Sequence, residues 1–237
     1  MSSGTSDRLR GASTARLLCA VGASAALAAC MTAKLDENRT MSTSIAKDEG
    51  IVILAKPQVE GTGAEQDFMS CIGGKLAQGR EPFSVYGNNA FQDTLYPWFE
   101  PSTAPVRAEG ISTLLTHPKV ARRLAETGVR YVVWLDGNTR KTDGGGSIAC
   151  GVAPGMIGCI GFGWWEKQSD YQATVWDLKS AKSAGSVTTN VTGTSALLGL
   201  GVPLPFIARV QGTACDRMAG QLRTFLKGGD PSVASAP

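Results

Sequence analysis

The chain has 237 residues, of which 43% are apolar and 18% are charged, which indicates a globular protein and excludes a largely disordered one. Residues 1–29 hold three arginines and one aspartate, so the remaining chain carries 20 basic against 19 acidic side chains and lacks the charge that strong nucleic-acid binding requires. The single histidine, His117, leaves little material for histidine-based catalysis or a multi-histidine metal site, and we expect no metal and no cofactor.

The first 29 residues have the pattern of a secretory signal. The arginines precede residues 17–29, which are uncharged, small and apolar. A helix of that length rises only about 20 Å, which is too short for a bilayer core of roughly 30 Å. We therefore predict that residues 1–29 are a signal peptide that is removed after export.

The end of this stretch, Leu27-Ala28-Ala29-Cys30, resembles the lipobox of bacterial lipoproteins. The resemblance implies cleavage before Cys30 and acylation of its thiol and its amino group, for example by palmitate. Several acyl chains anchor a protein stably, whereas one chain is only marginal. Met31 stands where Asp favours retention in the inner membrane, so the resemblance implies the outer membrane. The alternative is an ordinary signal peptide beside an incidental cysteine.

The residues after Cys30 show no apolar periodicity until about residue 49. Residues 30–48 are rich in Thr, Ser and Lys and are predicted to be a lipidated tether. A periplasmic domain is predicted over residues 49–228. Residues 229–237 are rich in Pro, Ser and Ala and are predicted to be a disordered tail.

Hydrophobic periodicity predicts both strands and helices within the domain. A wholly apolar run at residues 51–54 predicts a buried strand. Pro118 and Gly128 predict the start and the end of a helix, because proline suits the first turn and glycine the residue after the last. The other predicted elements are helices over residues 64–78 and about 208–226 and strands over residues 83–86, 129–135, 171–178 and 186–192.

Three stretches interrupt this periodicity. Residues 87–116 contain several prolines, residues 143–146 are Asp-Gly-Gly-Gly, and residues 150–159 are predicted to be a glycine-rich turn. The remaining order is strand, helix, strand, helix, strand, then antiparallel strands and a final helix. That order predicts a single α+β domain with a mixed β-sheet and flanking helices.

Four cysteines remain after the signal and the lipobox: Cys71, Cys150, Cys159 and Cys215. An even number in an oxidising compartment indicates two disulfide bonds. Glycine and proline between Cys150 and Cys159 let the chain turn back, and Cys71 and Cys215 lie on predicted helices near the two ends of the domain. We therefore predict the pairs 150–159 and 71–215. A zinc site is the alternative, but the C-x-x-C spacing that it favours is absent.

Two segments resemble a module of cell-envelope proteins. Residues 120–133 form a helix that leads straight into a strand, and residues 171–182 end in Asp177-Leu-Lys-Ser-Ala-Lys182, where the module has Asp-x-x-Thr-Gly-Lys. Together they resemble the module shared by the N-terminal domain of TolB, the curli secretion lipoprotein CsgG and the penicillin-binding-protein activator LpoB. The resemblance implies the fold of roughly residues 50–226 and a cell-envelope setting, and it brings no catalytic residues.

No arrangement of residues predicts catalysis. Residues 61–66 begin like the G-x-G-x-x-G loop of dinucleotide-binding proteins, but their last position is Gln66, which favours an ordinary turn between a strand and a helix. His117 precedes Pro118 at a predicted helix start, and no nucleophile motif accompanies it. We therefore predict that the protein is not an enzyme.

Two segments, residues 151–165 and 196–207, are apolar, poor in charge and rich in glycine or proline. They are predicted either to cover the core as strand ends and loops or to form an exposed apolar surface that meets a partner. In the second case the candidate partner-binding residues are large apolar anchors of the kind that interfaces favour. These residues are Phe162, Trp164, Trp165, Leu204 and Phe206.

The sequence therefore predicts a lipoprotein on the periplasmic face of the outer membrane. Its domain is predicted to bind another envelope protein or a second copy of itself, with no nucleic-acid partner. The alternative is a transport-auxiliary lipoprotein whose apolar segments line a pocket for a lipid or another small ligand. Both hypotheses assign the membrane anchor to Cys30 and differ in what residues 151–165 and 196–207 contact.

Overall fold

The computed structural model describes residues 31–55, 65–99, 103–105, 109–153 and 156–228. The predicted signal peptide, the predicted lipidation site Cys30 and the predicted tail of residues 229–237 lie outside these residues. The glycines at positions 61 and 63 lie outside them as well. The side chains of residues 153, 156, 157 and 200–204 are not described.

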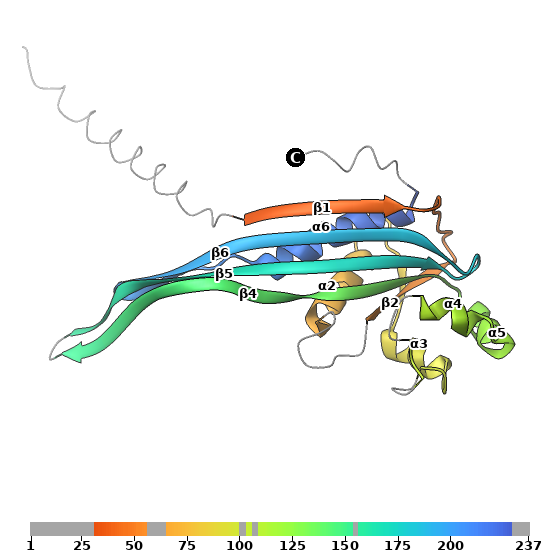
Figure 1. Cartoon of the computed structure of the whole chain (residues 1–237), viewed down its shortest axis with the longest axis horizontal. Coiled ribbons are helices and arrows are strands. Elements are labelled where there is room, and N and C mark those ends of the chain that lie inside the picture. Colours follow the sequence, from red (N-terminus) through yellow and green to blue (C-terminus); the bar gives the residue numbers. More distant parts are fainter. Residues whose placement is uncertain (1–30, 56–64, 100–102, 106–108, 154–155, 229–237) are drawn as a thin grey trace, which may run out of the picture. The chain divides into compact units, whose positions relative to one another are not determined.

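The described strands form one mixed sheet (Figure 1). Its order is β1-β6-β5-β4-β2-β3. β1 runs antiparallel to β6, whereas β2 runs parallel to both β3 and β4. The predicted α+β fold with a mixed sheet and flanking helices is confirmed. The strands are β1 (Met31–Arg39), β2 (Gly50–Ala55), β3 (Ser84–Tyr86), β4 (Val129–Ala153), β5 (Met156–Asp177) and β6 (Lys182–Phe206).

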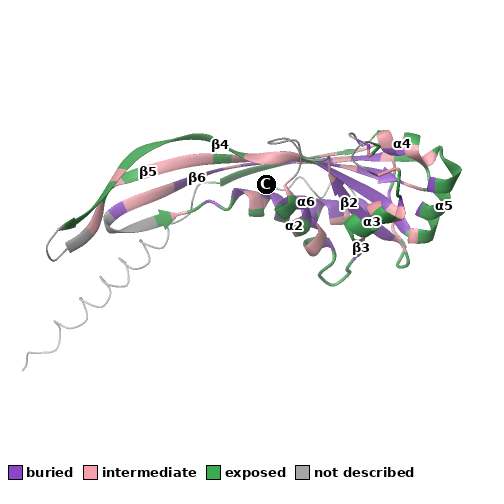
Figure 2. Ribbon diagram, turned by 90° about the horizontal axis from the view of Figure 1, so that it is seen from below, coloured by how far each residue is buried: buried purple, intermediate pink, exposed green. Residues whose placement is uncertain are grey.

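Helices cover both faces of this sheet. Successive strand residues point to opposite faces, so the buried run of β2 packs on both sides. On one face Val52 and Leu54 pack with α3 (Asn88–Thr94), α4 (Gly110–Leu115) and α5 (Pro118–Thr127). On the other face Ile53 lies beside α2 (Gln66–Leu76), which packs along α6 (Val210–Leu226). Figure 2 shows buried positions concentrated where the strands lie among these helices.

The predicted disulfide between Cys71 and Cys215 joins α2 to α6 and is confirmed. Their Cα atoms are 6.3 Å apart, within the range that a disulfide bond allows. Cys215 is buried at the α2–α6 contact. The bond therefore fixes the two helices that cover one face of the sheet.

Helix α5 begins and ends as the sequence predicts. Pro118 occupies its first turn, and Gly128 follows it with φ of 69°, in the left-handed region that glycine adopts without strain. Val120 and Leu124 are its buried residues and contact the core. Local sequence signals are sufficient for this helix because its caps and its apolar spacing agree.

The prediction that residues 87–116 are irregular is wrong for α3 and α4. Each of these helices is short and buries one large side chain, Phe91 in α3 and Ile111 in α4. Phe91 is the one large apolar side chain of α3, so α3 gives no helical period. In α4 the residues Ile111, Leu114 and Leu115 have helical spacing and pack on the core, but the helix is only six residues long and the prediction missed it. Tertiary packing on the sheet stabilises both.

The predicted tether is wrong for residues 31–39, which form β1 and pair antiparallel with β6 along their whole length. The Arg39 guanidinium also donates a hydrogen bond of 3.1 Å to the carbonyl of Phe225 in α6. β1 is a polar strand at the edge of the sheet, so its exposed face carries no apolar pattern. Residues 31–39 are therefore part of the folded domain.

The chain forms two compact units. The helical unit comprises described residues 31–144, 166–193 and 209–228 and contains all five described helices. The strand unit comprises residues 145–165 and 194–208. β4, β5 and β6 each contribute residues to both units, and these strands are 25, 22 and 25 residues long.

Candidate interaction surface

The structure places the predicted partner-binding residues on strands of the strand unit. Phe162, Trp164 and Trp165 lie in β5, while Leu204 and Phe206 lie at the end of β6. The predicted glycine-rich turn over residues 150–159 is wrong for most of its length, because β4 continues to Ala153 and β5 begins at Met156. The glycines at positions 144–146 also lie within β4, where the sequence predicted a break.

Glycines in these strands permit the close approach of neighbouring backbones. Gly146 has φ of 106°, and a Cβ there would collide with the backbone of Phe162. Gly161 has φ of 136°, and a Cβ there would collide with the backbone of Ser147. Such positions accept only glycine. The glycine run at 144–146, which was predicted to be a break, therefore lies within a paired strand, and Gly146 permits the close backbone contact there.

The predicted Cys150–Cys159 disulfide is confirmed and joins β4 to β5. Gly146 lies against Gly163, and Ile148 lies against Gly161. The same antiparallel register puts Cys150 directly opposite Cys159, with their Cα atoms 4.0 Å apart. The bond therefore links β4 to β5, the strand that carries Phe162 and Trp164.

Several large apolar side chains of this unit face solvent. The exposed fraction is 80% for Val152, 75% for Ile160, 48% for Phe162 and 62% for Ile207. Of the predicted residues, Trp164, Trp165 and Phe206 are half-buried, and the side chain of Leu204 is not described. Sequence reasoning missed Val152, Ile160 and Ile207, because all residues in these segments are apolar or small and no alternation marks the exposed positions.

The predicted residues do not all share one face. Alternation along β5 places Phe162 and Trp164 on one face and Trp165 on the other. The Trp164 ring lies beside Gly145 of β4, whose missing side chain leaves room for it. Phe162 is the more exposed of the pair. The surface that a partner can reach therefore centres on Ile160 and Phe162.

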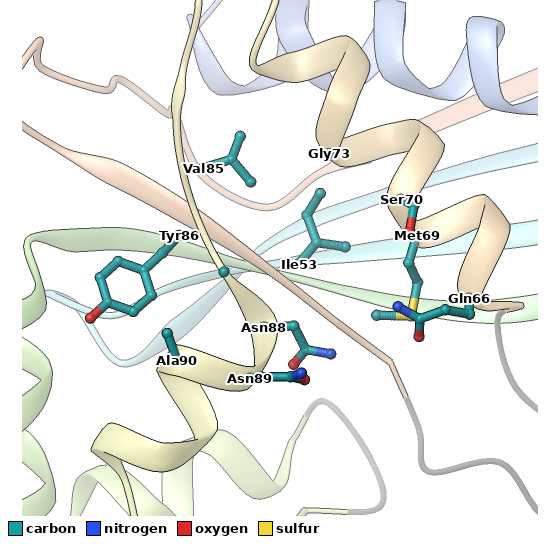
Figure 3. A pocket seen from close by; sticks show the side chains of 11 residues that line it. Ile53, Gln66, Met69, Ser70, Gly73, Val85, Tyr86, Asn88, Asn89 and Ala90 are labelled. Atoms are coloured by element: carbon teal, nitrogen blue, oxygen red, sulfur yellow. The ribbon is translucent and has the colours of Figure 1, made fainter.

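A pocket of about 340 Å³ opens in the helical unit beside α2 and the turn between β3 and α3 (Figure 3). Its apolar lining comes from Ile53, Met69 and Val85, and its polar lining includes the amides of Asn88 and Asn89. No charged side chain is among the described lining residues, which suits a small uncharged ligand. The pocket contains no residue of segments 151–165 or 196–207, although the alternative hypothesis assigned the ligand to these segments.

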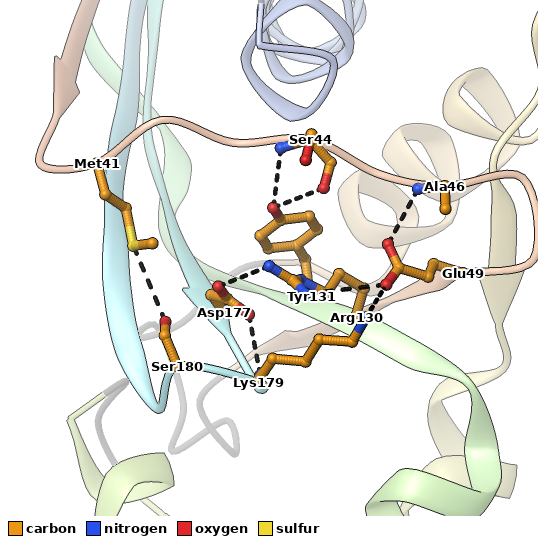
Figure 4. A network of polar contacts seen from close by, with 9 residues as sticks. All are labelled: Met41, Ser44, Ala46, Glu49, Arg130, Tyr131, Asp177, Lys179 and Ser180. Carbon is orange, nitrogen blue, oxygen red and sulfur yellow. Dashed lines mark hydrogen bonds and ion pairs between the residues drawn. The ribbon is translucent and has the colours of Figure 1, made fainter.

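A polar network in the helical unit ties the segment after β1 to the sheet (Figure 4). The Tyr131 hydroxyl donates to the carbonyl of Ser44 at 2.9 Å and accepts from the Ser44 N–H at 3.1 Å. The Arg130 guanidinium donates to the carboxylate of Asp177 at 2.9 Å, and Asp177 is almost fully buried. The Tyr131–Ser44 hydrogen bonds therefore fix a residue that was predicted to be tether, and the Arg130–Asp177 pair joins β4 to the end of β5.

Two groups of the helical unit have pKa values moved from their ordinary range. The Ala46 N–H and the Lys179 ammonium both bind the Glu49 carboxylate and lower its pKa. Burial raises the pKa of Tyr171, whose ring stacks on Phe68 at a centroid distance of 3.6 Å. Both groups hold elements of the fold together and neither faces the pocket of Figure 3.

His117 is exposed at the start of α5, and its side chain makes no capping hydrogen bond.

Within the part of the chain that the structure describes, no cluster of three or more His, Cys, Asp or Glu could hold a metal ion. In the same residues no helix combines the length and the apolar character needed to cross a membrane.

No family model matches the chain, and no curated protein matches it. Two solved structures of the PelC dodecamer from Paraburkholderia phytofirmans are similar to it. One has a TM-score of 0.42 and 13% identity, covering 84% of this chain and 99% of that one. The other has a TM-score of 0.41 and 12% identity, covering 84% of this chain and 100% of that one. Similarity at this level identifies neither a family nor a function for this chain.

Proposed function

We propose that this chain is a non-catalytic, lipid-anchored protein of the bacterial cell envelope whose strand unit binds another envelope protein. Its location is the periplasmic face of the outer membrane, supported by the lipobox-like residues 27–30 and by Met31. The main observation in favour of the binding role is that Ile160 and Phe162 are exposed on β5, which a disulfide bond links to β4.

The anchor needs no tether. Cys30 directly precedes β1, so the acylated residue would be joined to the sheet without a linker. The bilayer would then lie next to the start of β1. A short connection of this kind restricts the distance at which the domain meets a partner, so the partner would also be close to the membrane.

The first prediction concerns this anchor. Replacing Cys30 by Ser is expected to leave the precursor without acyl chains and to remove nearly all of the protein from the outer-membrane fraction, because no other anchor is predicted. Fractionation of the cell envelope and intact-mass measurement of the mature chain check this. Replacing Cys19, which lies inside the predicted signal, is the matched control and should change neither result. Normal fractionation of the Cys30→Ser variant would contradict the lipoprotein proposal.

The exposed side chains of the strand unit are suited to protein binding. Full burial of a side chain such as Phe162 or Ile160 contributes roughly 1.5–3 kcal/mol, so a few of them suffice to anchor an interface. The Cys150–Cys159 bond holds their strands before binding, which lowers the entropy lost on association. A rigid apolar surface of this kind is typical of a contact with another folded protein.

The second prediction tests this surface. A photo-crosslinking residue at position 160 is expected to trap a defined envelope protein in intact cells, and adding Phe162→Asp should reduce that product at least tenfold, because it places a charge in the apolar contact. A crosslinker at Arg122, an exposed residue of α5, is the control and should not trap the same protein. Equal products from positions 160 and 122 would contradict a specific surface.

A second candidate function follows from the pocket of Figure 3. Its uncharged lining supports binding of a small neutral ligand, as in a transport-auxiliary lipoprotein. Organic extraction of the purified protein, followed by mass spectrometry, would release such a ligand. Absence of a crosslinked protein together with a released ligand would favour this candidate over the protein-binding role.

A further inference from the structure

The β1 strand ends the sheet on one side, and no described strand pairs with its outer edge. β1 is nine residues long, whereas β3, at the opposite edge of the sheet, has three. An edge strand of this length presents a row of N–H and C=O groups to which another strand can bind. The side chains of Thr32, Lys34, Asp36 and Asn38 are all exposed along it.

The hydrogen bonds to β6 show which β1 residues direct their backbone groups outward. The Thr40 N–H donates to the carbonyl of Ala184 at 3.0 Å, and these two residues continue the register of β1 and β6. Backbone groups of successive strand residues point to opposite sides. Even-numbered residues therefore bond toward β6, and Ala33, Leu35 and Glu37 offer their backbone groups at the free edge.

We propose that β1 pairs antiparallel with β1 of a second copy of this chain, about a twofold axis at Leu35. Leu35 then forms a hydrogen-bonded pair with the partner's Leu35, and Ala33 forms one with the partner's Glu37. Lys34 lies directly opposite the partner's Asp36, in a position without backbone hydrogen bonds, where cross-strand side chains are closest. The twofold axis creates this charge pair twice.

The charges of β1 select this register over its neighbours. Moving the axis by one residue to Lys34 would place two lysines directly opposite each other, and moving it to Asp36 would place two aspartates opposite each other. Like charges in directly opposed positions are destabilising, whereas opposite charges stabilise the pair. The i, i+2 spacing of Lys34 and Asp36 therefore makes the strand complementary to itself in one register.

Contacts on the other face of β1 are compatible with this pairing. Glu37 binds Arg39 and Gln221 within its own chain, so its carboxylate is already satisfied when the strands meet. Leu35 is half-buried and would gain an apolar contact with the partner's Leu35. The pairing uses residues of the helical unit and does not depend on the partner proposed for Ile160 and Phe162.

Charge exchange on the full-length chain tests the proposal. The purified protein is expected to be a dimer by light scattering, with detergent mass subtracted if the chain is acylated. Lys34→Asp alone and Asp36→Lys alone should each weaken the dimer at least tenfold, because each places like charges opposite each other twice. The double variant carrying both substitutions restores opposite charges and should recover dimerisation.

A crosslink reports the register directly. A short bismaleimide is expected to join two Leu35→Cys chains, whereas Thr32→Cys should not crosslink, since the two copies of residue 32 would be about 20 Å apart along paired strands at roughly 3.4 Å per residue. A monomeric wild-type protein would overturn the proposal. So would an oligomer that survives Lys34→Asp, or crosslinking of Thr32→Cys equal to that of Leu35→Cys. Unchanged thermal unfolding of the variants would show that none acts by misfolding.

Discussion

Replacing Cys71 and Cys215 together by serine is expected to lower the free energy of unfolding by about 5 kcal/mol. The bond joins residues 144 positions apart, and in the chain-entropy model a closed loop of that length removes this much conformational freedom from the unfolded state. The loss is a large part of the stability of an ordinary domain. Urea titration of the oxidised protein and of the double variant measures the difference.

The second disulfide provides the matched control for this experiment. Replacing Cys150 and Cys159 by serine opens a loop of only nine positions, for which the same model gives about 2.6 kcal/mol. The long-range bond should therefore contribute roughly twice as much as the local one. A larger loss from the local bond would show that strain or residual structure, and not loop length, determines their contributions.

Replacing Arg130 by Met should cost about 3 kcal/mol of stability. The guanidinium lies 2.9 Å from the carboxylate of Asp177, whose side chain is 1% exposed, and removing it leaves a buried charge without its partner. Glu49, 3.8 Å from the same guanidinium, would lose a neighbouring cation as well. Chemical denaturation at neutral pH measures the loss.

Arg140 supplies the comparison for Arg130. It pairs with Asp170 at the same 2.9 Å distance, but the two side chains are 52% and 34% exposed, so Arg140→Met should cost less than about 1 kcal/mol. Adding Asp177→Asn to Arg130→Met should recover part of the loss, because the buried charge disappears. Similar losses from Arg130→Met and Arg140→Met would mean that burial does not decide the strength of these pairs.

The turn after Asp177 contains a residue in the left-handed conformation. Asp177 accepts a hydrogen bond of 2.9 Å from the Lys179 N–H, and Ala181 has φ of 53°. That left-handed conformation costs a non-glycine residue roughly 1 kcal/mol. A glycine at position 181 would adopt this conformation without strain. The sequence located the turn, and the structure shows the conformation that it needs.

Only part of the candidate surface could be predicted from the sequence. The apolar character of residues 151–165 was evident, and Phe162 is indeed exposed. The exposure of Ile160 and the separation of Trp164 from Trp165 by strand alternation were not, because residues 150–159 were predicted to be a turn and residues 160–165 were assigned to no strand. Without the strand pairing, the face of each side chain cannot be assigned.

The sequence alone was sufficient to predict the features that depend on residue type, count and local spacing. The Pro118 and Gly128 ends of α5, the apolar run of β2 and the cysteine pairing all follow from short-range pattern, count and spacing, and the structure contains each of them. Only the tertiary structure decided the extent of β4, β5 and β6 and the inclusion of residues 31–39 in the sheet. Strand pairing depends on backbone partners that are far away in the chain. A polar or glycine-rich strand that is stabilised by such partners has no local hydrophobic pattern from which it could be predicted.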